Sequence, residues 1–282
     1  MTLAYIVIAS LAGGLASALF AALIAWRIQP RLIPLFVSFA VGALLGVVFL
    51  DVVPHIFERS GRPHDMAAWI LGGILAFFVL EKLVLWRHNH DHAGQAESAI
   101  AGALRTHDHA HHATGSVHGN HAAGDGTANA GGRRSSAWMI IIGDGFHNFT
   151  DGFAIAAAFM ADVRLGMVTS VAIVAHELPQ ELGDFLVLIH SGFSKARALF
   201  WNVVSSFATL AGALIAYAAL TSFEGLSLVF LCLAASSMIY VAIADLIPGL
   251  HRLTSPGESA QQIVLIALGV ASIEAVHLLL SH

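Results

Sequence analysis

Long apolar runs separated by short polar breaks constrain the fold of this sequence more than any other feature. A helix needs about 20 apolar residues to cross the hydrocarbon core of a bilayer, and helices satisfy their own backbone there. Only 11% of the residues are charged, against roughly 25% in soluble domains. The sequence therefore predicts an all-α polytopic membrane protein with eight transmembrane helices, at about 3–25, 33–56, 66–86, 137–161, 165–190, 196–220, 226–248 and 260–280.

Two of these expected helices, 137–161 and 165–190, carry polar and ionisable residues in their middle. Spacings of three and four place each set on one helical face. Such residues are costly in a membrane unless they face a polar interior and have partners. Nitrogen and oxygen ligands without thiolates suit a divalent transition metal such as Zn²⁺. The two sets are Asp144, His147, Asn148 and Asp151, and His176, Glu177, Gln180, Glu181 and Asp184.

Two other interpretations of these polar residues stay open. The residues could join two helices through hydrogen bonds alone. His176 and Glu177 also begin an H-E-x-x-H pattern, which would indicate an intramembrane metallohydrolase with Glu177 as the base. The second histidine of that pattern is replaced by Gln180, and Pro179 kinks the helix within it. A metal sensor without transport is a further possibility.

The motifs HNFTDG (147–152) and HELPQELGDF (176–185) resemble the fourth and fifth transmembrane helices of the ZIP (Zrt/Irt-like) metal transporters. The most similar branch carries HE-[IL]-P-H-E-[LV]-GDF, and this chain departs from it at Gln180, where histidine is usual. The resemblance implies an inverted-repeat bundle that carries divalent metal ions, above all Zn²⁺, into the cytoplasm. Fe²⁺, Mn²⁺ and Cd²⁺ are the alternative substrates.

We expect a binuclear-type metal site at mid-membrane between these two helices. A primary position would use His147, Asp151, His176 and Gln180. Asn148, Glu177 and Glu181 would form or support a second position, with Asp151 as a bridge. In ZIP proteins the sixth helix can contribute to a second metal position, which makes Asn202 a further candidate; hydrogen bonding between helices is the alternative role.

A short frame recurs near the ends of the second and seventh expected helices: an aspartate, two aliphatic residues, a proline and then a histidine. Its members are Asp51, Pro54 and His55 in the first copy and Asp245, Pro248 and His251 in the second. Inverted repeats with a site near the midplane are common in transporters. We expect Asp51 and His55 to collect metal outside, and Asp245 and His251 to pass it inward. The alternative for both aspartates is a helix-capping role at the interface.

Lysine and arginine are distributed unequally between the two sides of the expected membrane. Ten lie on one side and three on the other, out of 13 in total, and the richer side is expected to be cytoplasmic. Both termini then lie outside, in agreement with an even number of spans. We expect a multi-pass protein of the cell (inner) membrane, with metal ions and the lipid bilayer as partners, and a homodimer is left open.

The segment 87–136 differs in composition from the rest of the single transmembrane domain, 1–282. It holds nine of the 17 histidines and lacks helical or strand periodicity. Histidine-rich tracts of this kind bind metal loosely and cannot form a core. We expect a disordered cytoplasmic loop that buffers or senses metal, with a plain spacer as the alternative. The chain shows no nucleic-acid pattern and no nucleotide or catalytic motif, so we expect no nucleic-acid partner, no ATP-driven step and no enzyme.

Overall fold

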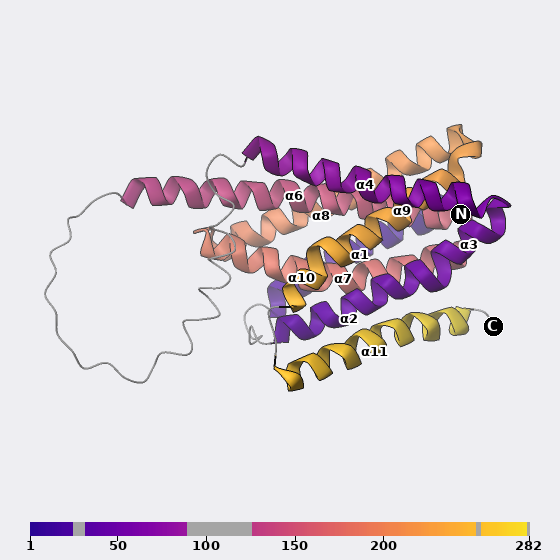
Figure 1. Ribbon diagram of the computed structural model, residues 1–282. Helices are drawn as coiled ribbons and strands as arrows, with labels where there is room; N and C mark the ends of the chain where they lie inside the picture. Colours follow the sequence, from indigo (N-terminus) through magenta and orange to yellow (C-terminus); the bar gives the residue numbers. More distant parts are fainter. Residues whose placement is uncertain (25–31, 89–125, 252–254, 281–282) are drawn as a thin grey trace, which may run out of the picture.

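The computed structural model describes residues 1–24, 32–88, 126–251 and 255–280; the side chains of residues 83–88, 126–136 and 224 are not described. The described part is helical and contains no strand (Figure 1). The helices and helical turns are α1 (Thr2–Ile24), α2 (Ile33–Gly46), η2 (Val47–Val52), α3 (Val53–Ser60), α4 (Pro63–His88), α6 (Gly126–Ala161), α7 (Val163–His190), α8 (Lys195–Ser222), η3 (Glu224–Leu226), α9 (Ser227–Tyr240), η4 (Val241–Leu246), α10 (Ile247–Leu250) and α11 (Pro256–Leu280).

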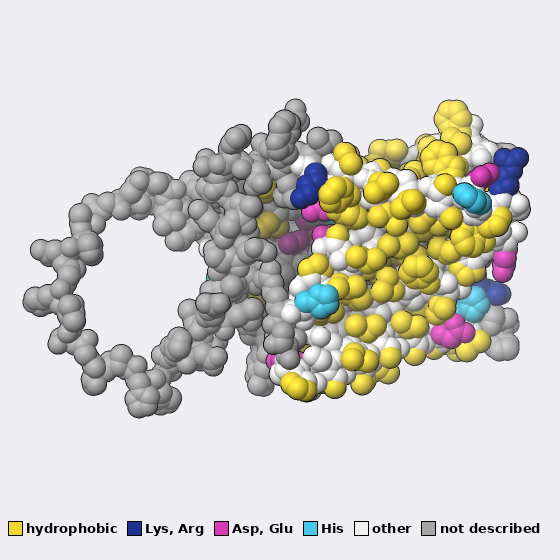
Figure 2. Space-filling model, in the orientation of Figure 1, with side chains coloured by type: hydrophobic (Ala, Val, Ile, Leu, Met, Phe, Trp, Pro, Cys, Tyr) yellow, Lys and Arg dark blue, Asp and Glu magenta, His cyan; other side chains and the backbone are white. Residues whose placement is uncertain are grey.

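The prediction of an all-α polytopic membrane protein is confirmed. Six helical segments of the described chain are long and apolar enough to cross a membrane: 2–24, 33–60, 63–82, 195–222, 227–250 and 256–280. The other two long helices, α6 and α7, carry the polar residues and pack among these six, chiefly against α8 and α1. Hydrophobic side chains cover the visible flank of the bundle, and charged side chains gather near its two ends (Figure 2).

The helix contacts follow an inverted repeat in which α1, α2 and α4 correspond to α8, α9 and α11, and α6 corresponds to α7. If each helix is replaced by its counterpart, the pair α2–α11 corresponds to the pair α9–α4, and both pairs are in contact. The pair α6–α8 likewise becomes α7–α1, and α6–α9 becomes α7–α2. The repeat places α6 and α7 at its centre, as transporter sites near the midplane require.

The aspartate–proline frame coincides with a local widening of both helices that carry it. The π-helical turns η2 and η4 each end shortly before the proline of the frame, Pro54 and Pro248. Proline lacks an N–H group and its ring clashes with the carbonyl four residues earlier, so a wider turn accommodates it. Asp51 and Asp245 lie within these turns at equivalent positions.

The helix α6 begins at Gly126 rather than near Ala137, and α4 continues to His88. Extending an existing helix adds one hydrogen bond per residue without a new nucleation step, which allows the helix to continue despite the low helix propensity of the glycines and serines in 126–136. The predicted loop 87–136 therefore includes residues that are helical in the structure: 87–88 belong to α4 and 126–136 to α6. Its central part, 89–125, lies outside the described residues, so its disorder and its metal binding stay predictions.

A single residue, Asp162, separates α6 from α7 and fixes their register. Its side chain caps α7 by accepting hydrogen bonds from the backbone N–H groups of Arg164 (2.8 Å) and Leu165 (3.2 Å). The two helices are therefore antiparallel neighbours with almost no slack between them. His147 precedes Asp162 by 15 residues and His176 follows it by 14, so the two histidines lie at the same level.

Candidate metal site

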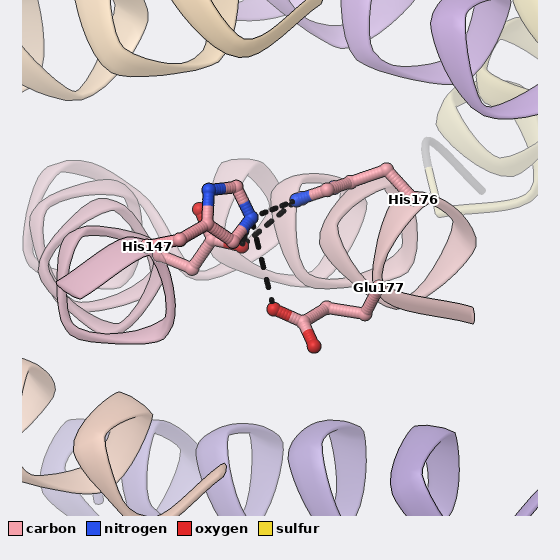
Figure 3. Close-up of side chains that lie close together, drawn as sticks. His147, His176 and Glu177 are labelled. Atoms are coloured by element: carbon pink, nitrogen blue, oxygen red, sulfur yellow. Dashed lines mark hydrogen bonds and ion pairs between the residues drawn. The ribbon is translucent and has the colours of Figure 1, made fainter. Parts of the chain in front are cut away.

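Four side chains from α6 and α7 converge in the interior of the bundle: His147 and Asp151 from α6, and His176 and Glu177 from α7. One ligand atom from each lies within 4.8 Å of all the others. The Nε2 atoms of His147 and His176 are 3.1 Å apart, and Nε2 of His147 is 4.0 Å from Oε1 of Glu177. Figure 3 shows His147 pointing across to His176 and Glu177. We call these four residues the quartet.

The spacing within the quartet fits a tetrahedral zinc site. Two nitrogens at 2.0–2.1 Å from one zinc ion stand about 3.3 Å apart in a tetrahedron. Oδ2 of Asp151 is 2.9 Å from Nε2 of His176 and 3.4 Å from Nε2 of His147, which is the same range. The Nδ1 atom of His176 lies 3.3 Å from the carbonyl oxygen of Ala172. This contact leaves Nε2 of His176 directed at the other quartet atoms.

Glu177 is the side chain of the quartet with the fewest partners. Its residue is 2% exposed, and neither carboxylate oxygen has a hydrogen-bond partner in the described part of the chain. A buried charge is retained at low cost only when it is paired or coordinates a metal ion. The chemistry of the donor set, two imidazoles and two carboxylates, therefore fits a divalent cation at this point.

Asn148 lies one turn away from the quartet and makes hydrogen bonds with protein groups. Its amide nitrogen donates to Oδ1 (2.9 Å) and the backbone carbonyl (3.1 Å) of Asp144. Its amide oxygen accepts from the hydroxyl of Thr209 on α8, at 3.0 Å. These bonds tie α6 to α8 beside the site, so Asn148 supports the quartet in this conformation.

Glu181 and Asn202 meet at the contact between α7 and α8. The amide of Asn202 donates to the backbone carbonyl of Glu181 at 3.0 Å, and the hydroxyl of Ser206 donates to Oε1 of Glu181 at 3.2 Å. The other oxygen, Oε2, has no hydrogen-bond partner although the residue is fully buried. Gln180, the neighbouring residue, lies beside Asp144. The ligand roles of Gln180, Glu181 and Asn202 stay predictions.

The first copy of the aspartate frame lies at the end of the bundle that carries both termini (Figure 1). Asp51 is buried and forms an ion pair with His277 of α11, while its Oδ2 atom has no hydrogen-bond partner. The buried Nε2 atom of His55 also has none in the described chain. The pairing of Asp51 with His277 was missed by the sequence reasoning, because nothing in the sequence relates residues 226 positions apart.

The second copy of the frame lies towards the opposite end. Asp245 and His251 are both exposed. The hydroxyl of Tyr240, near Asp245 in the sequence, donates a short hydrogen bond to Glu81 of α4. Neither copy of the frame belongs to the quartet. Whether these residues bind metal stays a prediction.

A buried imidazole–carboxylate site at the centre of an inverted repeat of membrane-length helices is an arrangement typical of membrane transporters. The model of the family described as "ZIP Zinc transporter" matches residues 1–276. The chain therefore belongs to the ZIP family.

Curated relatives agree with this assignment. The chain is 32% identical to the zinc transporter ZIP4 of Mus musculus over 76% of this chain and 38% of ZIP4. It is 27% identical to mouse ZIP13 over 83% of this chain and 66% of ZIP13. It is 38% identical to human ZIP10 over 56% of this chain and 19% of ZIP10. The matches thus span less than two thirds of the length of these relatives.

Proposed function

We propose that this protein transports divalent metal ions across a membrane, with Zn²⁺ as the main substrate and the quartet as the mid-membrane binding site. The observation that carries the proposal is the buried quartet, in which Glu177 has no hydrogen-bond partner among the described residues and the two Nε2 atoms are 3.1 Å apart. Membership in the ZIP family and the names of the relatives, all zinc transporters, support the choice of substrate. The same membership disfavours the metallohydrolase alternative.

The ligand types support both selective binding and release. Imidazole suits Zn²⁺ and Fe²⁺ better than Ca²⁺, and the carboxylates also accept Mn²⁺ and Cd²⁺ as competitors. A site without thiolates holds zinc less tightly than a structural cysteine site, which allows the ion to leave. Gln180 can add a carbonyl oxygen to the primary position, and Asn148, Glu181 and Asn202 would shape its surroundings.

Transport toward the cytoplasm is what the resemblance to ZIP proteins implies, and the distribution of Lys and Arg gives the orientation of the chain. The excess of Lys and Arg on one side predicts a cytoplasmic location for the end opposite the termini. Asp51, His55 and His277 would then receive the ion outside, and Asp245 and His251 would release it inside. Tags at both termini should be accessible to antibody on intact cells, whereas tags accessible only after permeabilisation would contradict this orientation. Location in the cell (inner) membrane and assembly as a homodimer belong to the same proposal.

Uptake of ⁶⁵Zn²⁺ into proteoliposomes that contain the purified full chain tests the proposal. Uptake should exceed that of protein-free liposomes and should fall when unlabelled Zn²⁺, Fe²⁺, Mn²⁺ or Cd²⁺ competes, with Zn²⁺ the most effective. Ca²⁺ should compete poorly, because it prefers oxygen ligands alone. Uptake equal to that of protein-free liposomes, together with metal-dependent peptide hydrolysis in detergent, would support the hydrolase instead.

A further inference from the structure

A cavity of about 430 Å³ lies at the end of the bundle opposite both termini, where α7 turns into α8 (Figure 1). Its lining comes from three places: Trp138 on α6, the turn 191–193, and Arg197, Phe200 and Trp201 on the first two turns of α8. Cavities of this volume hold small organic ligands in many proteins. The quartet lies elsewhere, so the transport proposal leaves this cavity without a role.

Three aromatic rings form one wall of the cavity. The rings of Trp138 and Trp201 meet edge to face, with centroids 4.8 Å apart, and the ring of Phe200 lies 5.3 Å from that of Trp201. Trp138 and Phe200 nevertheless remain 45% and 57% exposed. Tryptophan is enriched where the hydrocarbon core of a bilayer meets the headgroups, because its ring is apolar and its N–H is polar. The wall therefore fits the glycerol and first CH₂ groups of a lipid.

Arg197 supplies the charge of the cavity. It is the only charged side chain among the described residues of the lining, and no acidic residue of the described chain forms an ion pair with it. Its backbone N–H donates to the hydroxyl of Ser194 at 3.3 Å, which fixes the start of the side chain on α8. A guanidinium group binds a phosphate through two parallel hydrogen bonds. A phosphate group is therefore the chemistry that complements this cavity.

The depth of the cavity matches the boundary between hydrocarbon and headgroups. Trp138 precedes His147 by nine residues on α6, or about 14 Å along the helix. Arg197 precedes Asn202 by five residues, and Asn202 contacts Glu181, which follows the histidine of α7 by five; the two steps together give about 15 Å. Half the hydrocarbon core is also about 15 Å thick. Measured from the quartet as the midplane, Arg197 and Trp138 thus lie at the level of the lipid phosphates.

We propose that this cavity binds an anionic phospholipid, with the phosphate on the guanidinium of Arg197 and the glycerol and first CH₂ groups against the aromatic wall. A free phosphate ion would leave that wall without a partner, which favours the lipid. An anionic lipid also keeps a net negative charge, which the amine of a zwitterionic lipid would offset. By the proposed orientation the lipid belongs to the cytoplasmic leaflet, where anionic lipids attract basic residues. The inference is independent of the proposed transport function.

Native mass spectrometry of the full chain in detergent tests this inference, with phosphatidylglycerol and phosphatidylcholine of equal chain length as probes. The wild type should retain one phosphatidylglycerol at lower lipid concentration than phosphatidylcholine. Arg197→Gln should weaken phosphatidylglycerol binding by at least about 10-fold, because a hydrogen bond between charged groups is lost. The matched control is Arg164→Gln, which removes an exposed arginine at the other end of the bundle and should bind as the wild type does.

Equal phosphatidylglycerol binding by Arg197→Gln and Arg164→Gln would overturn the inference, and so would equal retention of the two lipids by the wild type. Displacement of phosphatidylglycerol by an equal concentration of inorganic phosphate would assign the cavity to the free ion instead. If Arg197→Gln does not fold, Phe200→Ala gives a second comparison, because it trims an exposed ring of the wall and should also weaken binding. Unchanged binding by Phe200→Ala would then contradict the proposed site.

Discussion

Glu177 is the residue whose surroundings depend most on a bound cation. The two histidines and Asp151 contact one another directly, whereas Glu177 approaches them only through Oε1, 4.0 Å from Nε2 of His147, and neither of its oxygens has a hydrogen-bond partner among the described residues. A metal ion supplies the missing charge compensation, and its departure leaves Glu177 uncompensated. The quartet is thus built to bind and to be emptied, as a transport site must be.

At the same scale, Gln180 is expected to set the metal preference. A neutral carbonyl oxygen is a poorer zinc ligand than an imidazole. The substitution Gln180→His should therefore tighten zinc binding, raise zinc selectivity over Mn²⁺ and slow release, so that maximal uptake falls. Competition uptake assays measure this profile, with Gln261→His, at an exposed position of α11, as the control. An unchanged metal profile in Gln180→His would show that residue 180 does not contact the ion.

The elements around the site are held together by close helix crossings. A Cβ atom at Gly152 of α6 would lie 1.8 Å from the carbonyl oxygen of Thr209 on α8, and one at Gly212 would lie 2.0 Å from that of Phe149. Each glycine thus permits the backbone of the partner helix to approach. Thr209 also donates to Asn148, so this crossing carries part of the support of the quartet.

The substitution Gly152→Ala should weaken the crossing of α6 and α8. Overpacking a tight contact costs about 1–3 kcal/mol, so the thermal unfolding midpoint in detergent should fall. Gly145→Ala is the matched control, because it lies on the same helix and a Cβ atom there meets nothing within 4 Å. Equal midpoints for the two variants would contradict the importance of this crossing.

Most of the helices could be predicted from the sequence, because apolar length alone marks a membrane span. The place of His147 and His176 in the middle of two neighbouring helices could also be predicted, from the expected helix bounds 137–161 and 165–190. The π-helical turns and the partner of Asp51 could not be predicted. The π-helical turns depend on how each helix accommodates its proline. The pairing of Asp51 with His277 depends on the packing of α2 against α11, which is a tertiary contact.

For the whole molecule, the inverted repeat and the segment 89–125 have separate expected roles. The repeat forms the bundle and the quartet, whereas the histidine-rich segment between α4 and α6 is expected to act outside the transport path. Replacing residues 90–125 by a Gly/Ser linker of equal length should leave the maximal rate of zinc uptake unchanged and should alter its apparent affinity or regulation. Loss of uptake in a variant that folds and reaches the membrane would give this segment a part in the transport path.

The central claim is that one ion is bound jointly by α6 and α7. Each of His147→Ala, Asp151→Ala and His176→Ala should then lower ⁶⁵Zn²⁺ uptake by at least about 10-fold. The double variant His147→Ala/His176→Ala should be little worse than either single variant, since ligands of one ion act as a unit. The decisive measurement is ⁶⁵Zn²⁺ uptake per molecule of protein in the membrane. The predicted result is that each single variant loses most of the uptake and that the double variant loses little more. Near-normal uptake in both single histidine variants would contradict the account.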